Sequence, residues 1–283
     1  MDIDNTPLAP PAAQSPESPA LAPSAPGSAE RAVPEDVRVP WTWFDLLLLA
    51  VLGFCLSVLL SLALAWVFGR FGVTPAQIKK SPGFFTAIHQ ALLFLLLLAY
   101  LIAQVRLNFG APFWRTIGWR GLEPKAVPRA LRYFGFVMLG FFLAVFVEVM
   151  SVQFGTRAKL PVQALFQDRR AAMLIMVTSV LGAPVFEETI FRGYIYPVVA
   201  RSFGITAGVL GTGILFGLMH APQLWGGWVQ ISMLVLVGIV LTYVRATTRT
   251  VLAGFLIHIS YNLSISFAVV LVSHGLRLIS PHH

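Results

Sequence analysis

Apolar side chains recur along this chain in long runs that short polar stretches separate. Seven such runs follow one another from Trp41 almost to the C-terminus. Because a helix needs about 20 mainly apolar residues to cross the hydrocarbon core of a bilayer, the pattern predicts an all-α, polytopic bundle of transmembrane helices. The predicted spans are 41–69, 84–105, 131–154, 172–199, 205–219, 227–244 and 251–273.

The fourth run is long enough to be divided, which would raise the number of spans from seven to eight. Gly182 and Pro184 lie inside it, just before two carboxylates. Proline kinks a helix because it has no backbone N–H and its ring clashes with the preceding turn. We therefore expect seven or eight spans, with a kink before the carboxylates.

A charged segment separates the second run from the third. Residues 106–134 mix Arg and Lys with Phe, Trp and Leu, which makes the segment too charged to cross a bilayer. This composition is typical of a segment that lies at the membrane surface.

Composition agrees with a membrane protein and sets the first forty residues apart. The 283 residues are 57% hydrophobic and 11% charged, far from the average of soluble domains. Residues 1–40 are rich in Pro, Ala and Ser and hold six of the twelve acidic residues. We expect a disordered tail there, followed by one transmembrane domain at 41–283. No apolar stretch precedes the first span, which predicts an uncleaved anchor rather than a signal peptide.

The net charge of +8 does not indicate nucleic-acid binding. The basic residues lie in short segments between the spans, where contact with anionic lipid head groups explains them. Eleven lie on one predicted side and eight on the other, so the positive-inside rule places the N-terminus in the cytoplasm. Cys55 is the single cysteine, which excludes a disulfide framework and a thiolate metal cluster.

Few ionisable side chains lie deep inside the predicted spans, where a charge is costly. They are the carboxylates of Glu148, Glu187 and Glu188 and the imidazoles of His220 and His258, besides Arg192. Ionisable residues at such depth usually mark a functional site.

Helical spacing separates the roles of the two adjacent carboxylates. Glu188 and Arg192 are four residues apart and share a helix face, which predicts an ion pair that makes their burial tolerable. Glu187 points about 100° away. The arginine cannot easily neutralise both carboxylates, so Glu187 is left for another task.

The same four-residue interval recurs in two later spans. His258 and Asn262 project an imidazole and an amide from one face, and Phe216 stands one turn before His220. A single intramembrane His or Asn often serves helix packing. Three polar sites near the same end of an apolar bundle favour a shared site.

Two kinds of hydrolytic chemistry fit this set of side chains. A carboxylate beside an imidazole in a dry cavity can act as a general base on water, and a second imidazole with an amide can stabilise an oxyanion. One Glu and two His also form an open zinc site. Glu187, His220 and His258 are then the candidate ligands. The cofactor is therefore either absent or zinc.

The order of the three motifs resembles the CPBP family of intramembrane proteases, which includes type II CAAX prenyl endopeptidases and bacteriocin-processing proteins. The motifs are E-E-x-x-x-R (Glu187, Glu188, Arg192), F-x-x-x-H (Phe216, His220) and H-x-x-x-N (His258, Asn262). They lie within a core of about residues 171–273. The resemblance implies a bundle of about eight helices in a bacterial inner or plasma membrane.

The resemblance also implies a role for each motif residue. Glu187 activates water with help from His220, and His258 and Asn262 stabilise the oxyanion. Glu188, Arg192 and Phe216 support the site. Family members have been described as metalloproteases and as glutamate-type enzymes. An asparagine is a poor ligand for a transition metal, which favours the metal-free version.

The expected function is an intramembrane endopeptidase that acts on a membrane-tethered protein or peptide. The substrate could be a prenylated C-a-a-X protein or a bacteriocin-like precursor. A proton-coupled transporter is the alternative from another class, although no inverted repeat of the spans is visible. A non-catalytic scaffold or immunity protein on the same fold is a third. Glu148 either lines the cavity or pairs with a basic group at the end of its span.

Overall fold

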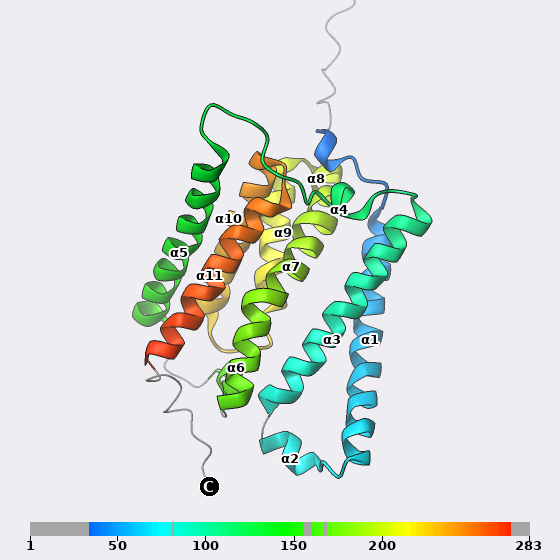
Figure 1. The fold of residues 1–283 in the computed structure, drawn as a ribbon, viewed down its shortest axis with the longest axis vertical. Helices are drawn as coiled ribbons and strands as arrows, with labels where there is room; N and C mark the ends of the chain where they lie inside the picture. Colours follow the sequence, from blue (N-terminus) through cyan, green and yellow to red (C-terminus); the bar gives the residue numbers. More distant parts are fainter. Residues whose placement is uncertain (1–33, 81, 156–159, 167–168, 273–283) are drawn as a thin grey trace, which may run out of the picture. The chain divides into compact units, whose positions relative to one another are not determined.

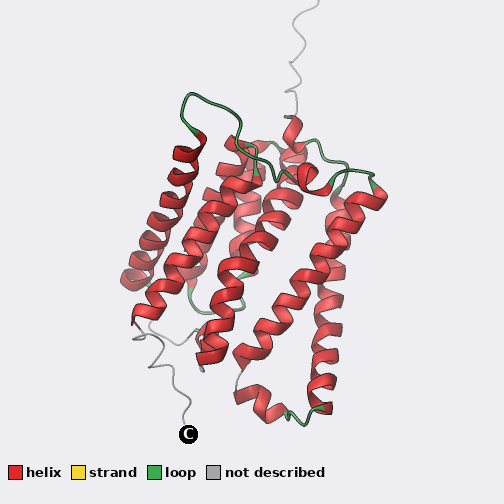
Figure 2. Cartoon of the chain, viewed as in Figure 1, coloured by secondary structure: helices red, strands yellow, loops and turns green. Residues whose placement is uncertain are grey.

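The computed structural model describes residues 34–80, 82–155, 160–166 and 169–272, and every regular element within these ranges is helical (Figures 1 and 2). The predicted all-α membrane fold is confirmed. Six helices are long and apolar enough to cross a bilayer: Trp43–Arg70, Pro82–Asn108, Arg129–Phe154, Arg169–Phe203, Trp228–Thr248 and Val251–Leu271. Their bounds lie within a few residues of the predicted spans.

The predicted count of seven or eight spans is not confirmed. The fifth predicted span forms α9 (Ile205–Met219), which is apolar but has only 15 residues. At 1.5 Å per residue it is about 22 Å long, shorter than a typical span. The fourth predicted span is one continuous helical segment of 35 residues, so it does not divide into two.

Two π-helical stretches interrupt this continuous segment. It consists of α6 (Arg169–Val177), η4 (Thr178–Gly182), α7 (Ala183–Glu188), η5 (Thr189–Ile195) and α8 (Tyr196–Phe203). Both η4 and η5 are π-helical. Gly182 ends η4 and Pro184 follows at the start of α7. The wider π-helical turn accommodates a proline, which has no N–H to donate, without ending the helix.

The other helices surround this segment. The long ones are α1 (Trp43–Arg70), α3 (Pro82–Ala103), α5 (Arg129–Phe154), α10 (Trp228–Thr248) and α11 (Val251–Val272). The short ones are η1 (Glu35–Val37), α2 (Pro75–Lys80), η2 (Gln104–Asn108), α4 (Phe113–Ile117) and η3 (Pro161–Phe166). The charged segment predicted at the membrane surface contains α4 and the irregular stretch up to α5.

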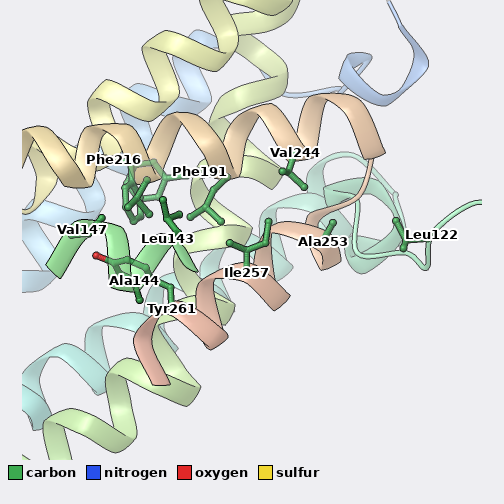
Figure 3. Packing of buried hydrophobic residues seen from close by; sticks show 12 residues of the cluster. Leu122, Leu143, Ala144, Val147, Phe191, Phe216, Val244, Ala253, Ile257 and Tyr261 are labelled. Carbon is green, nitrogen blue, oxygen red and sulfur yellow. The ribbon is translucent and has the colours of Figure 1, made fainter. Parts of the chain in front are cut away.

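Close helix packing brings α9, α10, α5 and α11 together. α9 packs most extensively on α10, and α5 on α11 (Figure 1). Glycine allows α9 to approach α10 closely. A Cβ atom at Gly213 would lie 2.6 Å from the backbone nitrogen of Ile239, and one at Gly217 would lie 2.6 Å from that of Val235. The shared core includes Leu143 of α5, Phe191 of η5, Phe216 of α9, Leu241 of α10 and Ile257 of α11. Figure 3 shows most of these side chains.

A polar network fixes η5 against α1 and η2. The Tyr194 hydroxyl donates to Gln104 Oε1 at 2.6 Å, and Gln104 Nε2 donates to Asp45 Oδ1 at 2.8 Å. Trp41 stacks on the Tyr194 ring with centroids 4.8 Å apart, and its indole N–H donates to the Tyr194 carbonyl. The segment that carries the two carboxylates is thus held from this side as well.

The structure extends into part of the predicted tail. Residues 1–33 lie outside the described residues, as do residues 273–283. From Pro34 onward the chain is packed, with Val37 and Val39 buried. Asp36 accepts from the buried Arg245 of α10 at 2.6 Å. Composition could not indicate this, because the partner of Asp36 lies 209 residues further along the chain.

Candidate active site

A buried ion pair forms the centre of the candidate site. Glu188 ends α7 and Arg192 follows one turn later in η5. Glu188 Oε1 accepts from Arg192 Nη1 at 2.9 Å, and both side chains are fully buried. The four-residue spacing on one helix face accounts for this contact.

Arg192 has partners on two further helices. Its Nη2 donates to the Gly238 carbonyl at 2.9 Å, and its Nε donates to Thr242 Oγ1 at 3.3 Å, both on α10. Its guanidinium lies 4.5 Å from the ring centroid of Phe216 on α9. Hydrogen bonds and a cation–π contact therefore surround the charge, which is the condition under which a buried ion is tolerated.

His258 of α11 joins the two adjacent carboxylates. Its Nδ1 lies 2.9 Å from Glu188 Oε1, and its Nε2 lies 3.7 Å from Glu187 Oε2. Glu188 Oε1 already accepts from Arg192, so it accepts from His258 as well, and Nδ1 carries the hydrogen. Nε2 is then the ring nitrogen that faces Glu187.

The two carboxylates differ sharply in exposure. The side chain of Glu187 is 15% exposed, whereas that of Glu188 is 0% exposed. Glu188 is enclosed by its partners, and Glu187 is the carboxylate that a small molecule such as water can reach. This difference agrees with the division of roles that their 100° separation predicts.

Phe216 lies between the polar groups of the site. Its ring contacts the rings of His258 and His220 with centroids 5.8 Å and 5.0 Å apart, and the ring of Phe191 at 5.2 Å. Figure 3 shows Phe191 and Phe216 next to each other. The aromatic side chain keeps the Arg192 side of the site dry, which strengthens the electrostatic contacts there.

His220 lies at the end of α9 and is partly buried. Its Nδ1 lies 2.9 Å from the Phe216 carbonyl oxygen, one turn earlier. A carbonyl can only accept, so Nδ1 carries the hydrogen and Nε2 has its lone pair available. Among the described residues, none forms a hydrogen bond with His220 Nε2.

Asn262 connects α11 to the π-helical stretch η4. Its Nδ2 donates to the Ser179 carbonyl at 2.7 Å. In η4 the Ala183 N–H donates to Thr178, five residues earlier. The next donor in that register would be residue 184, but it is proline and has no N–H. Asn262 therefore supplies the hydrogen bond that Pro184 cannot give to Ser179.

The described residues do not form a metal centre. Within the described ranges, no three His, Cys, Asp or Glu side chains lie close enough together to hold a metal ion. Glu187, His220 and His258, the predicted zinc ligands, are therefore not gathered as a set, and His258 Nδ1 is engaged by Glu188. These side chains do not fit a zinc site.

Sequence reasoning missed three residues that shape the site. Gly238 and Thr242 bind Arg192, and a Cβ atom at Gly254 would lie 2.5 Å from Glu188 Oε2. Gly254 therefore leaves room for the buried carboxylate. Its position four residues before His258 was a usable signal, because Gly254, His258 and Asn262 share one face of α11.

The Glu188–Arg192 pair should dominate the stability of this region. Replacing Arg192 by Met leaves a buried carboxylate unpaired, and we expect it to lower the free energy of unfolding by about 3–5 kcal/mol. The double variant Arg192→Met with Glu188→Gln should recover part of this loss. Thermal unfolding of the purified protein in detergent measures both. The single variant Glu188→Gln completes the cycle. A loss in the double variant equal to the sum of the two single losses would contradict the pairing.

The Pro184–Asn262 relation predicts a non-additive pair of substitutions. Asn262→Ala leaves the Ser179 carbonyl without its donor, which should lower the free energy of unfolding by about 1–3 kcal/mol. In a Pro184→Ala background the new backbone N–H can bind that carbonyl, so the loss from Asn262→Ala should shrink. Additive effects in the same unfolding assay would show that Asn262 does not compensate for the proline.

Comparison with known proteins supports the resemblance that the motifs predict. Residues 169–264 match the family model described as type II CAAX prenyl endopeptidase Rce1-like. Searches of curated proteins and of solved structures found no match. The matched segment begins with α6, extends into α11 and contains all three motifs. The match therefore supports the resemblance of this segment to the type II CAAX prenyl endopeptidases.

Proposed function

We propose that the protein is an intramembrane endopeptidase that hydrolyses a peptide bond in a membrane-tethered protein or peptide. The family match supports a protease. The observation that carries the proposal is the contact of the partly exposed Glu187 with His258 Nε2 at 3.7 Å, while Glu188 holds the other nitrogen of the same ring. A carboxylate that water can reach, beside an imidazole held in place by a second carboxylate, suits general acid–base catalysis.

Glu187 is the proposed general base. It takes a proton from water while the water oxygen attacks the carbonyl carbon of the peptide bond, which places a negative charge on the carbonyl oxygen. The proton then passes to the leaving amine as the carbon–nitrogen bond breaks. His220 helps at this stage, because its Nε2 has a free lone pair.

His258 and Asn262 are the proposed oxyanion donors. Asn262 gives one amide hydrogen to Ser179 and has a second one left. His258 already donates from Nδ1 to Glu188, so it must carry a second proton, on Nε2, when it donates to the oxyanion. Glu188 and Arg192 act by positioning His258 rather than by contact with the substrate.

The membrane setting agrees with this proposal. The chain is an integral membrane protein with several apolar helices, so the bilayer would present its tethered substrate in two dimensions. We place the protein in a bacterial inner or plasma membrane with a cytoplasmic N-terminus, as the resemblance and the distribution of basic residues favour. The substrate class includes prenylated proteins and bacteriocin-like precursors.

Cleavage of membrane-tethered peptides by the purified protein in detergent tests the proposal. Glu187→Gln keeps the shape of the side chain but removes its basicity, and we expect the rate to fall about 100-fold or more. Glu123→Gln, in the segment between α4 and α5, is the matched control and should keep full activity. Both proteins are assayed with and without a zinc chelator. Activity that survives in Glu187→Gln would rule out this base, and no cleavage by the wild type of any candidate would favour the scaffold alternative.

Gly254 provides a second test, one that shifts the position of Glu188 without changing its charge. A methyl group at residue 254 would displace the Glu188 carboxylate and, through it, the His258 ring. We expect Gly254→Ala to lower kcat about tenfold or more while KM changes little. Gly211→Ala is the control, because its Cβ would lie 3.7 Å from Val199 Cγ1, an ordinary contact. Equal activity of the two variants would contradict the positioning role of Glu188.

A further inference from the structure

A groove runs between α5 and α11 on the side of α11 away from the candidate site. Its volume is about 550 Å³, and Figure 1 shows the two helices next to each other. Exposed apolar side chains at four-residue intervals form one wall on each helix, and small residues lie between the walls. The walls are Phe141, Val145 and Val149 on α5 and Leu263, Phe267 and Leu271 on α11, and the small residues are Ala144, Ser264 and Ala268.

The packing of the two helices explains why the groove is there. α5 and α11 approach closely at Gly140, where a Cβ atom would lie 2.8 Å from Ser260 Cβ. Next to this point Ser260 Oγ donates to the Val137 carbonyl at 2.7 Å. Beyond Gly140 the side chains of the two walls project outward and are exposed, and Ala144, Ser264, Ile265 and Ala268 form the floor of the groove between them.

Glu148 gives this apolar groove a charge. It lines the groove and is exposed, and it lies within the helix Arg129–Phe154 that is apolar enough to span a membrane. Within the described part of the chain, no hydrogen-bond or ion-pair partner contacts its carboxylate. A charge at such a position is costly and normally has a partner.

We propose that the groove binds a transmembrane helix of another protein, and that this helix carries a Lys or Arg side chain that pairs with Glu148. The small residues between the walls let a second backbone come close, as in other membrane helix contacts. The walls repeat every four residues, which is the spacing into which the ridges of a helix fit. The carboxylate selects a cationic partner by charge complementarity.

Two other occupants fit the groove less well. Glu148 lies six residues before the end of α5, about 9 Å along the helix axis, so a lipid amine would have to sink below the head-group level to reach it. In a second copy of the chain, Arg192 and Arg245 cannot serve as the cation, because they are 0% and 1% exposed and already paired.

The proposed binding of a helix in the groove does not depend on the proposed protease activity. Asn262 points from α11 towards η4 through its bond to Ser179. Ser264 and Ala268 lie about 200° and 240° further around the same helix, on the face that meets α5. Binding at the groove can therefore be measured without a substrate or a cleavage assay.

Binding of two synthetic helices to the full chain tests the proposal. The protein is placed in phosphatidylcholine nanodiscs, whose head groups have no N–H donors. One probe is a labelled Leu/Ala helix of about 20 residues with one Lys six residues from its end, and the other has Leu in place of Lys. We expect the Lys helix to bind about tenfold more tightly or better. Glu148→Gln should abolish this preference, whereas Glu123→Gln should keep it.

A groove-filling variant separates shape from charge. Ala268→Phe should weaken the binding of both probes, and Ser264→Leu serves the same purpose if the first variant does not fold. Equal binding of the two probes to the wild type would overturn the proposal, as would a Lys preference that survives Glu148→Gln. A preference that disappears when phosphatidylethanolamine replaces phosphatidylcholine would identify an amine lipid as the occupant and would also overturn it.

Discussion

The carboxylate of Glu188 is the group on which the arrangement of the site depends. Its Oε1 accepts from Arg192 and from His258, both at 2.9 Å. Arg192 in turn binds α10 and lies over Phe216 of α9, while His258 belongs to α11. One buried negative charge thus connects four helical segments, and each of them needs the others, because a buried ion that loses its partner destabilises a fold far more than the pair stabilises it.

Adjacent residues of one helix separate an enclosed charge from a partly exposed one, which is the proposed base. Glu188 points into the bundle and is enclosed, while Glu187 points about 100° away and remains 15% exposed. His258 contacts both, with a different ring nitrogen for each. The bond to Glu188 fixes the orientation of the ring, so the nitrogen that faces Glu187 has a defined position. This is how an outer carboxylate usually prepares a histidine for chemistry.

The sequence predicted what depends on local spacing and missed what depends on distant partners. The spans followed from apolar runs, and the contact of Glu188 with Arg192 followed from their four-residue interval. The contact of His258 with both carboxylates joins residues about 70 positions apart, and no local pattern encodes it. The bond between Asp36 and Arg245 was missed for the same reason. The span count stayed open because α9 is apolar but short.

The expected kink at Pro184 and the expected role of Asn262 turn out to be physically linked. Proline deprives the Ser179 carbonyl of a backbone donor, and in an apolar bundle that carbonyl cannot turn to water. The amide of Asn262 replaces the missing donor, and this bond fixes the plane of the amide. Its second N–H then has a fixed direction, about 120° from the first in that plane. A donor that is already held in place needs no reorganisation when a charge develops nearby, which is the property that stabilises an oxyanion most effectively. The structural bond to Ser179 and the proposed catalytic role of Asn262 are therefore compatible, because the first would prepare the second.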